Sequence, residues 1–251
     1  MHEPPVLERT KDGITVLTLN EPERRNPLSP AVVQGLTEAL NRLVDDDECR
    51  VVVLNGAGKG FCAGADLRRV REATIVSDRQ DYRAISELNK LIWFYPKPTI
   101  AAVHGFAIGG GCNLMTWCDF SVVELGTRIG YPEVALGMPA GAVIPTLLRT
   151  VGRRATLEIA LLGTEIDVAR AAELGLISRA VEPGQAFPVA MEMAETLAAR
   201  DPAAIAFTKE TIAMVSDMDY ERGISYARDL RVIARAAAEP RGQAPSPASS
   251  W

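Results

Sequence analysis

The sequence contains few of the residues that disulfide frameworks, metal sites and membrane spans require. Its 251 residues include four cysteines and two histidines. The cysteines show no CxxC spacing and no disulfide pattern, so we expect reduced thiols and a cytoplasmic location. A zinc site is not expected, because so few histidines are present. No apolar run approaches the roughly 18–20 residues of a membrane span, and the N-terminal stretch has no apolar signal core, so no membrane partner is expected.

Positive charge is also scarce. The chain has 27 Lys and Arg residues against 32 Asp and Glu residues, which gives a net charge of −5. Proteins whose main partner is nucleic acid usually carry a basic field, so nucleic acid is not expected as a partner. Hydrophobic residues make up 47% of the chain. That content supports a core, and the length fits one large domain or a domain with a small appendage.

Strand-like and helix-like segments alternate through the first half of the chain. Ser29 is in the N-cap position and Pro30 in the first helical position of a segment whose apolar residues repeat at helical spacing. The other predicted elements are strands over Ile14–Asn20, Arg50–Gly56, Pro98–Gly105 and 121–125, a helix from Ser77 that stops before Pro96, and a glycine turn into a short helix over 109–120. From Met138 onward we expect an almost entirely helical chain, and over 239–251 a disordered tail. This order favours an α/β fold.

Two glycine-rich segments, 55–67 and 105–113, each connect a predicted strand to a predicted helix. A phosphate-binding function fails on spacing. A P-loop lysine is followed by Ser or Thr, whereas Gly60 follows Lys59, and neither segment has the GxGxxG of a dinucleotide site. A nucleotide-phosphate protein is therefore disfavoured.

A different chemistry suits these two turns. Glycine leaves the backbone N–H open to close approach, and an N–H at a helix start has no intrahelical acceptor and lies at the positive end of the helix dipole. One N–H from each turn could converge on a single oxygen to form an oxyanion hole. The alternative is that both turns only pack tightly against neighbouring backbone.

Several motifs, in order from about Ile14 to about Arg200, resemble the enoyl-CoA hydratase/isomerase (crotonase) superfamily. They are ERRNPLS, VVVLNGAGKGFCAGADL, KPTIAAVHGFAIGGGCNLMTWCDF and GYPEVALGMPAGA, followed by VARAAELGLISRAV. The resemblance implies a spiral of ββα units as an α/β core over residues 1–200. It also implies a helical C-terminal region over 201–238 that mediates trimers or dimers of trimers. The implied substrate is an acyl-CoA thioester, with no further cofactor.

The resemblance also implies functional residues. The amides of Ala65 and Gly110 would form the oxyanion hole, and Glu133 and Asn113 would be the catalytic side chains. The residues implied for coenzyme A binding are Ala63, Asp66, Leu67, Arg68 and, as weaker candidates, Arg25 and Lys59.

The chain departs from the hydratase pattern at one catalytic position. Hydratases of this family use two glutamates, of which Glu133 is present and the other is replaced by Asn113. Asparagine cannot transfer a proton at neutral pH. A single base can still move a proton between carbons, which is double-bond isomerisation, or activate a water that Asn113 orients. Another enolate reaction, such as decarboxylation or C–C cleavage, and a catalytically silent acyl-CoA-binding protein remain alternatives.

Overall fold

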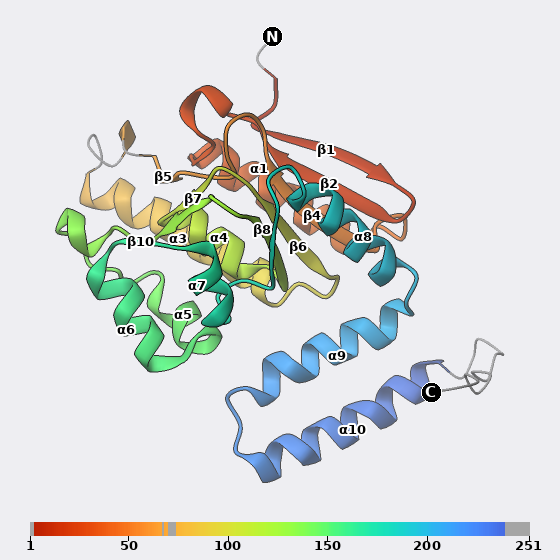
Figure 1. Ribbon diagram of the computed structural model, residues 1–251. Helices are drawn as coiled ribbons and strands as arrows, with labels where there is room; N and C mark the ends of the chain where they lie inside the picture. Colours follow the sequence, from red (N-terminus) through yellow and green to blue (C-terminus); the bar gives the residue numbers. More distant parts are fainter. Residues whose placement is uncertain (1–2, 67, 70–73, 239–251) are drawn as a thin grey trace. The chain divides into compact units, whose positions relative to one another are not determined.

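The computed structural model describes residues 3–66, 68–69 and 74–238 (Figure 1). Leu67 and the predicted disordered tail over 239–251 lie outside the described residues. The chain forms two compact units, Met1–Ala199 and Arg200–Trp251.

A six-stranded sheet organises the first unit. Its strands lie in the order β1 (Val6–Lys11), β2 (Ile14–Leu19), β4 (Val51–Gly56), β6 (Thr99–Val103), β8 (Phe120–Glu124) and β11 (Arg179–Val181). β1 pairs antiparallel to β2, and every other neighbouring pair is parallel. All five residues of β6 are buried. Continuous apolar runs of this kind are typical of parallel strands covered on both faces.

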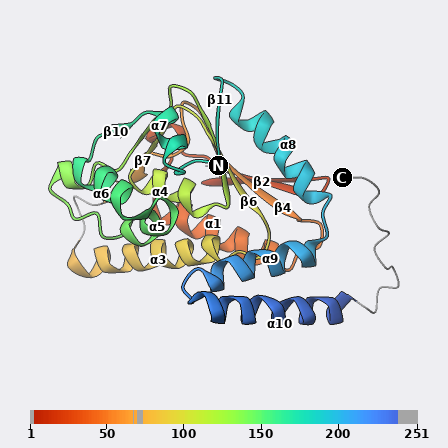
Figure 2. The same cartoon turned by 60° about the horizontal axis from the view of Figure 1, so that its bottom comes forward.

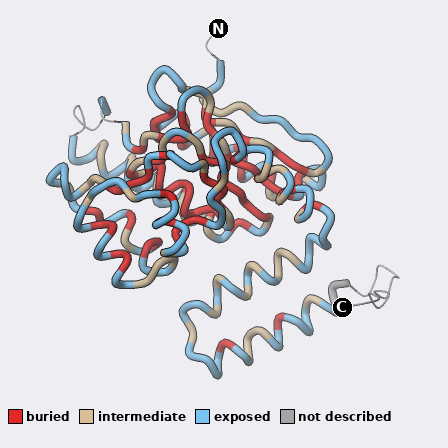
Figure 3. The backbone as a smooth tube through the Cα atoms, viewed as in Figure 1, coloured by how far each residue is buried: buried red, intermediate tan, exposed pale blue. Residues whose placement is uncertain are grey.

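Helices cover the two faces of this sheet (Figure 2). On one face, α8 (Ala186–Ala198) packs four buried alanines at every fourth position against the strands. On the other face, α1 (Pro30–Val44), α3 (Ile75–Trp93) and α4 (Gly110–Trp117) build the larger core. The buried residues, red in Figure 3, concentrate along the central strands and α4. The strand that precedes the second glycine turn and the helix that follows it are therefore both held in the core.

The helix starts follow local rules. The Ser29 side chain accepts a hydrogen bond from Val32 N at 3.2 Å, which confirms the predicted N-cap of α1. α3 begins two residues before the predicted Ser77, because Thr74 is its N-cap and Ser77 completes a capping box. Its end at Trp93 agrees with the predicted stop before Pro96.

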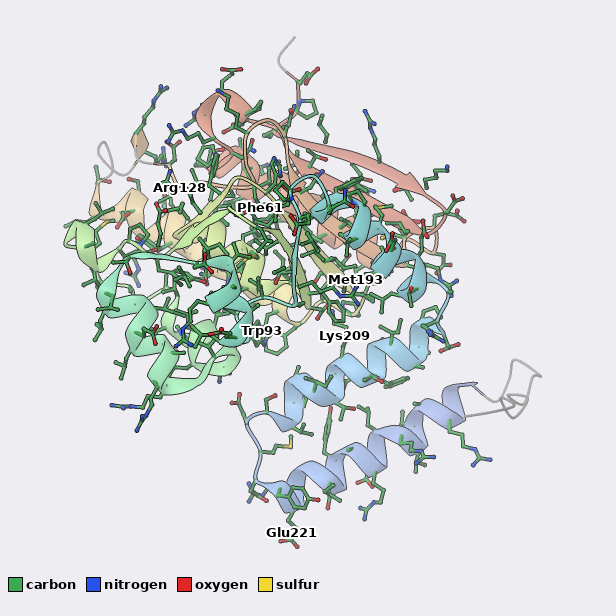
Figure 4. The ribbon with its side chains drawn as sticks, viewed as in Figure 1. Phe61, Trp93, Arg128, Met193, Lys209 and Glu221 are labelled. Carbon is green, nitrogen blue, oxygen red and sulfur yellow. The ribbon has the colours of Figure 1, made fainter. Side chains whose placement is uncertain are left out.

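Two smaller sheets lie beside the main one. β7 (Phe106–Ile108), β9 (Arg128–Gly130) and β10 (Glu165–Ile166) form the first, and β3 (Pro27–Leu28) and β5 (Gly64–Ala65) the second. The exposed Arg128 of β9, labelled in Figure 4, forms an ion pair with Glu165 of β10. Phe61, also labelled there, is fully buried just before β5.

The expectation of an almost entirely helical second half is wrong at two places. β10 and β11 are strands of two and three residues in that half. Segments this short carry no periodicity of their own, and each is a strand only because it pairs with a distant partner, β9 or β8. The remaining elements of the first unit are the 3-10 turns η1 (Pro22–Arg24) and η2 (Val134–Leu136) and the helices α5 (Ile144–Thr150), α6 (Gly152–Leu162) and α7 (Val168–Glu173).

The second unit is a pair of helices, α9 (Pro202–Val215) and α10 (Tyr220–Ala238). Asp201 caps α9 by accepting from Ala204 N at 2.8 Å. The Tyr226 hydroxyl of α10 donates to Glu210 of α9 at 2.9 Å. Among the described residues, no helix combines the length and the hydropathy needed to cross a bilayer.

Candidate active site

The two glycine turns meet in space. Gly64 has a φ of +85°, and a Cβ built on it would lie 2.4 Å from Ile108 O and 2.9 Å from Gly110 N. A Cβ built on Gly110 would lie 3.7 Å from Ala65 N. The backbones of β5 and of the α4 start therefore approach too closely for side chains, which brings the amides of Ala65 and Gly110 together.

Each glycine of the triplet 109–111 is explained by a different feature of its surroundings. Gly109 has a φ of +52° and faces the Glu133 carboxylate, since its Cβ would lie 3.1 Å from Glu133 Oε1. Gly110 is the first residue of α4, so its N–H has no acceptor within the helix and lies at the positive end of the helix dipole. Gly111 packs against backbone, because its Cβ would lie 2.1 Å from Cys62 O. The tight packing that the sequence allows is confirmed at Gly111, whereas an oxyanion hole at Gly110 stays a prediction.

Backbone hydrogen bonds hold the turns in register. Ile108 N donates to Cys62 O at 3.1 Å, and Cys62 N donates to Phe106 O at 3.2 Å. Gly109 N donates to Gly130 O at 2.7 Å, which connects the glycine triplet to β9. β9 ends three residues before Glu133, so one ladder positions the first turn, the second turn and the carboxylate.

Asn26 holds the first glycine turn through hydrogen bonds of its side chain. Its buried side chain donates to Ala57 O at 2.9 Å and to Gly60 O at 3.0 Å, and accepts from Glu21 N at 3.0 Å. Its backbone is left-handed with a φ of +50°, which asparagine tolerates better than most residues. The sequence reasoning assigned Asn26 no role, although it lies within the ERRNPLS motif.

Glu133 has the environment of a general base. It directly precedes η2 and is half-buried. Its Oε2 atom is buried and has no hydrogen-bond partner within the described part of the chain. Burial raises the pKa of this carboxyl above its ordinary value, against a smaller opposing effect of a backbone hydrogen bond. A carboxylate with a raised pKa accepts a proton more readily near neutral pH.

Asn113 lies one turn into α4, where its N–H donates to Gly109 O at 2.9 Å. The residue is 3% exposed, and its Oδ1 has no hydrogen-bond partner in the residues that the structure describes. Buried polar atoms in proteins are nearly always hydrogen-bonded to protein or water. The Asn113 Oδ1 and Glu133 Oε2 atoms are therefore each able to accept a hydrogen bond from water or from another molecule.

The residues predicted to bind coenzyme A fall into two groups. Ala63 N donates to Arg25 O at 3.0 Å, and the Asp66 carboxylate is paired with Arg24 and accepts from Arg68 N at 3.2 Å. Ala63 and Asp66 are thus engaged within the loop. The side chains of Arg25 and Arg68 are exposed, as is that of Lys59. The sequence reasoning missed Arg24, which holds Asp66.

The cysteines beside the site are packing residues. Cys62 and Cys112 are fully buried, and burial raises the pKa of each thiol to about 12. A thiol in that range is not a thiolate nucleophile at neutral pH. Within the described ranges, no group of His, Cys, Asp and Glu residues is arranged to hold a metal ion.

Comparison with known proteins identifies the family of this chain. The family model described as "Enoyl-CoA hydratase/isomerase" matches residues 9–238. A Thermus thermophilus protein named "Putative enoyl-CoA hydratase" is 40% identical over 225 residues, covering 88% of this chain and 89% of its own. The 2,3-dehydroadipyl-CoA hydratase of Escherichia coli is 31% identical over 218 residues, covering 86% and 85%. The crystal structure of an enoyl-CoA hydratase from Mycobacterium smegmatis superposes with a TM-score of 0.89 at 30% identity, covering 97% of this chain and 99% of that one.

The fold is therefore the crotonase fold, an α/β spiral with a helical C-terminal region, as the sequence predicts. The chain belongs to the enoyl-CoA hydratase/isomerase family and is an enzyme of that family.

Proposed function

We propose that this enzyme acts on an enoyl-CoA thioester whose oxygen is held by the amides of Ala65 and Gly110, with Glu133 as its acid/base. One observation carries the proposal: Gly110 faces the Ala65 nitrogen while the adjacent Gly109 faces Glu133 Oε1. The amides of Ala65 and Gly110 and one carboxylate thus border the same turn. Relatives named enoyl-CoA hydratases support the substrate class. Coenzyme A belongs to the substrate, so no separate cofactor is proposed.

The proposed chemistry passes through an enolate. Glu133 removes a proton from the carbon next to the thioester carbonyl, and the C–H electron pair becomes a C=C bond as the carbonyl π pair moves to oxygen. The two N–H groups stabilise the resulting negative charge, for which one donor is worth roughly 10²–10³ in rate. In a 3-enoyl-CoA the same proton returns to the γ carbon. The double bond has then moved, and Glu133 is again a carboxylate.

Hydration is the second candidate, favoured by the names of the relatives. Glu133 would take a proton from water as the hydroxyl adds to the β carbon, and would return a proton to the α carbon. The buried Asn113 amide would orient that water without exchanging a proton. With one carboxylate doing both tasks, we expect a slower hydratase than one with two.

The remaining assignments are also proposals. The exposed Arg25, Arg68 and Lys59 would meet the phosphates of coenzyme A, and the loop from Ala63 to Asp66 would line its path, with Leu67 beside it. The helical region over 201–238 would assemble the chain into trimers or dimers of trimers. A cytoplasmic location stays a prediction.

The decisive experiment follows proton exchange and products in heavy water. Crotonyl-CoA and a 3-enoyl-CoA are each incubated with the wild type, with Glu133→Gln and with Glu165→Gln as a control at an exposed carboxylate. We expect Glu133→Gln to lose at least about 10²-fold in activity and exchange, the usual range for a general base. The control should retain both.

The products separate the candidates. Conversion of the 3-enoyl thioester alone supports isomerisation, and net formation of 3-hydroxyacyl-CoA supports hydration. Full activity of Glu133→Gln would overturn its assigned role. Binding of both thioesters without turnover or exchange would contradict the enoyl-CoA proposal and favour decarboxylation, C–C cleavage or a silent binding protein.

A further inference from the structure

Several buried polar side chains lie next to the candidate site. Tyr131 is 0% exposed, and its hydroxyl lies 3.4 Å from Thr116 Oγ1. Thr116 Oγ1 in turn donates to the backbone oxygen of Asn113 at 2.9 Å. The phenol therefore contacts α4 at Thr116, whose hydroxyl is tied to the backbone of Asn113.

These buried side chains connect the two segments on which the candidate site residues lie. Asn113 and Thr116 belong to α4, whose first residue is Gly110. Tyr131 follows β9 directly and stands two residues before Glu133. The residue between them is Pro132, whose ring fixes φ and restricts the backbone of Tyr131 as well. The position of the Tyr131 ring therefore influences where the backbone places Glu133 after β9.

A core position does not by itself require this hydroxyl. Phenylalanine would fill the same volume without burying a polar atom, and an unpaired buried hydroxyl is unfavourable. Here the partner that the structure describes for the hydroxyl is Thr116 Oγ1 of α4. This contact joins the helix with the proposed oxyanion amide to the segment with the proposed base.

We propose that Tyr131 is a positioning residue, whose hydroxyl holds Glu133 in register with the Gly110 amide through Thr116. The proposal rests on the role proposed above for Glu133. A base displaced by about 1 Å loses up to roughly 10²-fold in rate, because proton transfer requires close alignment. We expect binding of the coenzyme A moiety to be independent of this register, so that KM changes little.

Tyr95 offers a matched control. It is 1% exposed, and its hydroxyl donates to Leu40 O of α1 at 2.9 Å, so it also loses one buried hydrogen bond on change to phenylalanine. Its partner lies on no element that carries Glu133 or the two amides. Tyr131→Phe and Tyr95→Phe are compared for melting temperature, kcat, KM and the rate of α-proton exchange in heavy water.

We expect similar falls in melting temperature for the two variants but different kinetics. Tyr131→Phe should lower kcat and exchange by about 10- to 100-fold with KM within about twofold, and Tyr95→Phe should leave all three within about twofold. Equal kcat values for both variants would overturn the proposal. If Tyr131→Phe does not fold, Thr116→Val tests the same connection, and Thr116→Ser, which keeps the hydroxyl, should restore kcat. Loss of kcat in Thr116→Ser equal to that in Thr116→Val would also overturn it.

The outcome is separable from that of the proposed function. Inactive Glu133→Gln with fully active Tyr131→Phe would leave Glu133 as the base and remove only the positioning role. Active Glu133→Gln would overturn the base itself, whatever the result for Tyr131.

Discussion

At the scale of single residues, we expect the number of carboxylates in the site to decide which reaction it favours. Asn113 and Glu133 both border Gly109, the first through a backbone hydrogen bond and the second through its carboxylate. Only Glu133 can exchange a proton, and an amide can only hold a water or an oxygen in place. Restoring a second carboxylate at position 113 should therefore change which reaction the site prefers.

The Asn113→Glu variant tests this directly. We expect hydration of crotonyl-CoA to rise at least about tenfold relative to isomerisation of a 3-enoyl-CoA, because a second acid/base is typically worth 10²–10⁴ in rate. Asn113→Gln is the control, since it has the same shape without the charge and should not favour hydration. An unchanged ratio of the two products in Asn113→Glu would contradict the idea that carboxylate number sets the reaction.

The raised pKa of Glu133 also predicts the pH dependence of stability. Because burial raises the pKa above the reference value of 4.5, the folded state holds the proton more tightly than the unfolded state. The contribution of Glu133 to stability is then greatest below about pH 4.5 and is lost as pH rises through the folded pKa. Above that range Glu133→Gln should melt at a higher temperature than the wild type, while losing activity. The acid limb of kcat should correspondingly lie above the usual range of a glutamate.

Glu165 provides a control of opposite sign. The Arg128 guanidinium lowers the pKa of this exposed carboxyl, so its contribution is present above the unfolded pKa and is lost as pH falls through the folded pKa. Glu165→Gln should melt slightly lower than the wild type at neutral pH, by a small amount because exposed ion pairs contribute little. A lower melting temperature for Glu133→Gln at pH 7 would contradict the burial of an uncompensated charge.

At the scale of elements, two neighbouring glycines of α4 should respond differently to alanine. A Cβ on Gly110 would lie 3.0 Å from the flexible end of the Leu28 side chain and 3.7 Å from Ala65 N. We expect Gly110→Ala to fold and to lose roughly 10²-fold in kcat, because the methyl group crowds the two amides. A Cβ on Gly111 would lie 2.1 Å from the backbone oxygen of Cys62. Gly111→Ala should therefore be destabilised by about 1–3 kcal/mol or more.

Melting curves and kcat on the same preparations check this pair. Full activity of Gly110→Ala would contradict the place of its amide in the site. A Gly111→Ala protein as stable as the wild type would contradict the close approach of the two turns.

The sequence predicts the elements that depend on local rules and misses those that depend on partners. The helix from Ser29 and Pro30 and the buried strand near Arg50–Gly56 are confirmed, because capping and continuous apolar runs are local signals. β10 and β11 were not predictable from their own residues, since pairing with β9 and β8 makes them strands. The site shows the same division. Motifs locate Ala65, Gly110 and Glu133 as candidates, whereas the contact of Tyr131 with Thr116 arises only from folding.

At the scale of the whole molecule, the two helices of the second unit expose several large apolar side chains. Large apolar side chains on α9 and α10 remain open, with exposed fractions of 61% for Ile212, 85% for Tyr220, 55% for Ile224 and 64% for Val232. α9 has no buried residue at all along its described length. Contiguous exposed apolar surface usually marks an interaction site. The proposed trimer or dimer of trimers would bury such surface between copies of the chain.

Sedimentation velocity tests this assembly. We expect the wild type to sediment as three or six copies of the chain, and the double variant Ile224→Lys, Val232→Lys to shift toward the single chain, because burying two ammonium groups in an apolar contact is costly. Gln80→Lys, which adds a lysine at an exposed position of α3, should keep the assembly mass of the wild type.

The activity of the dissociated variant answers a second question. If it also lost activity, the site would depend on a neighbouring copy. Full activity as a single chain would show that Ala65, Gly110 and Glu133 suffice within one chain. A wild type that sediments as a single chain would contradict the proposed assembly.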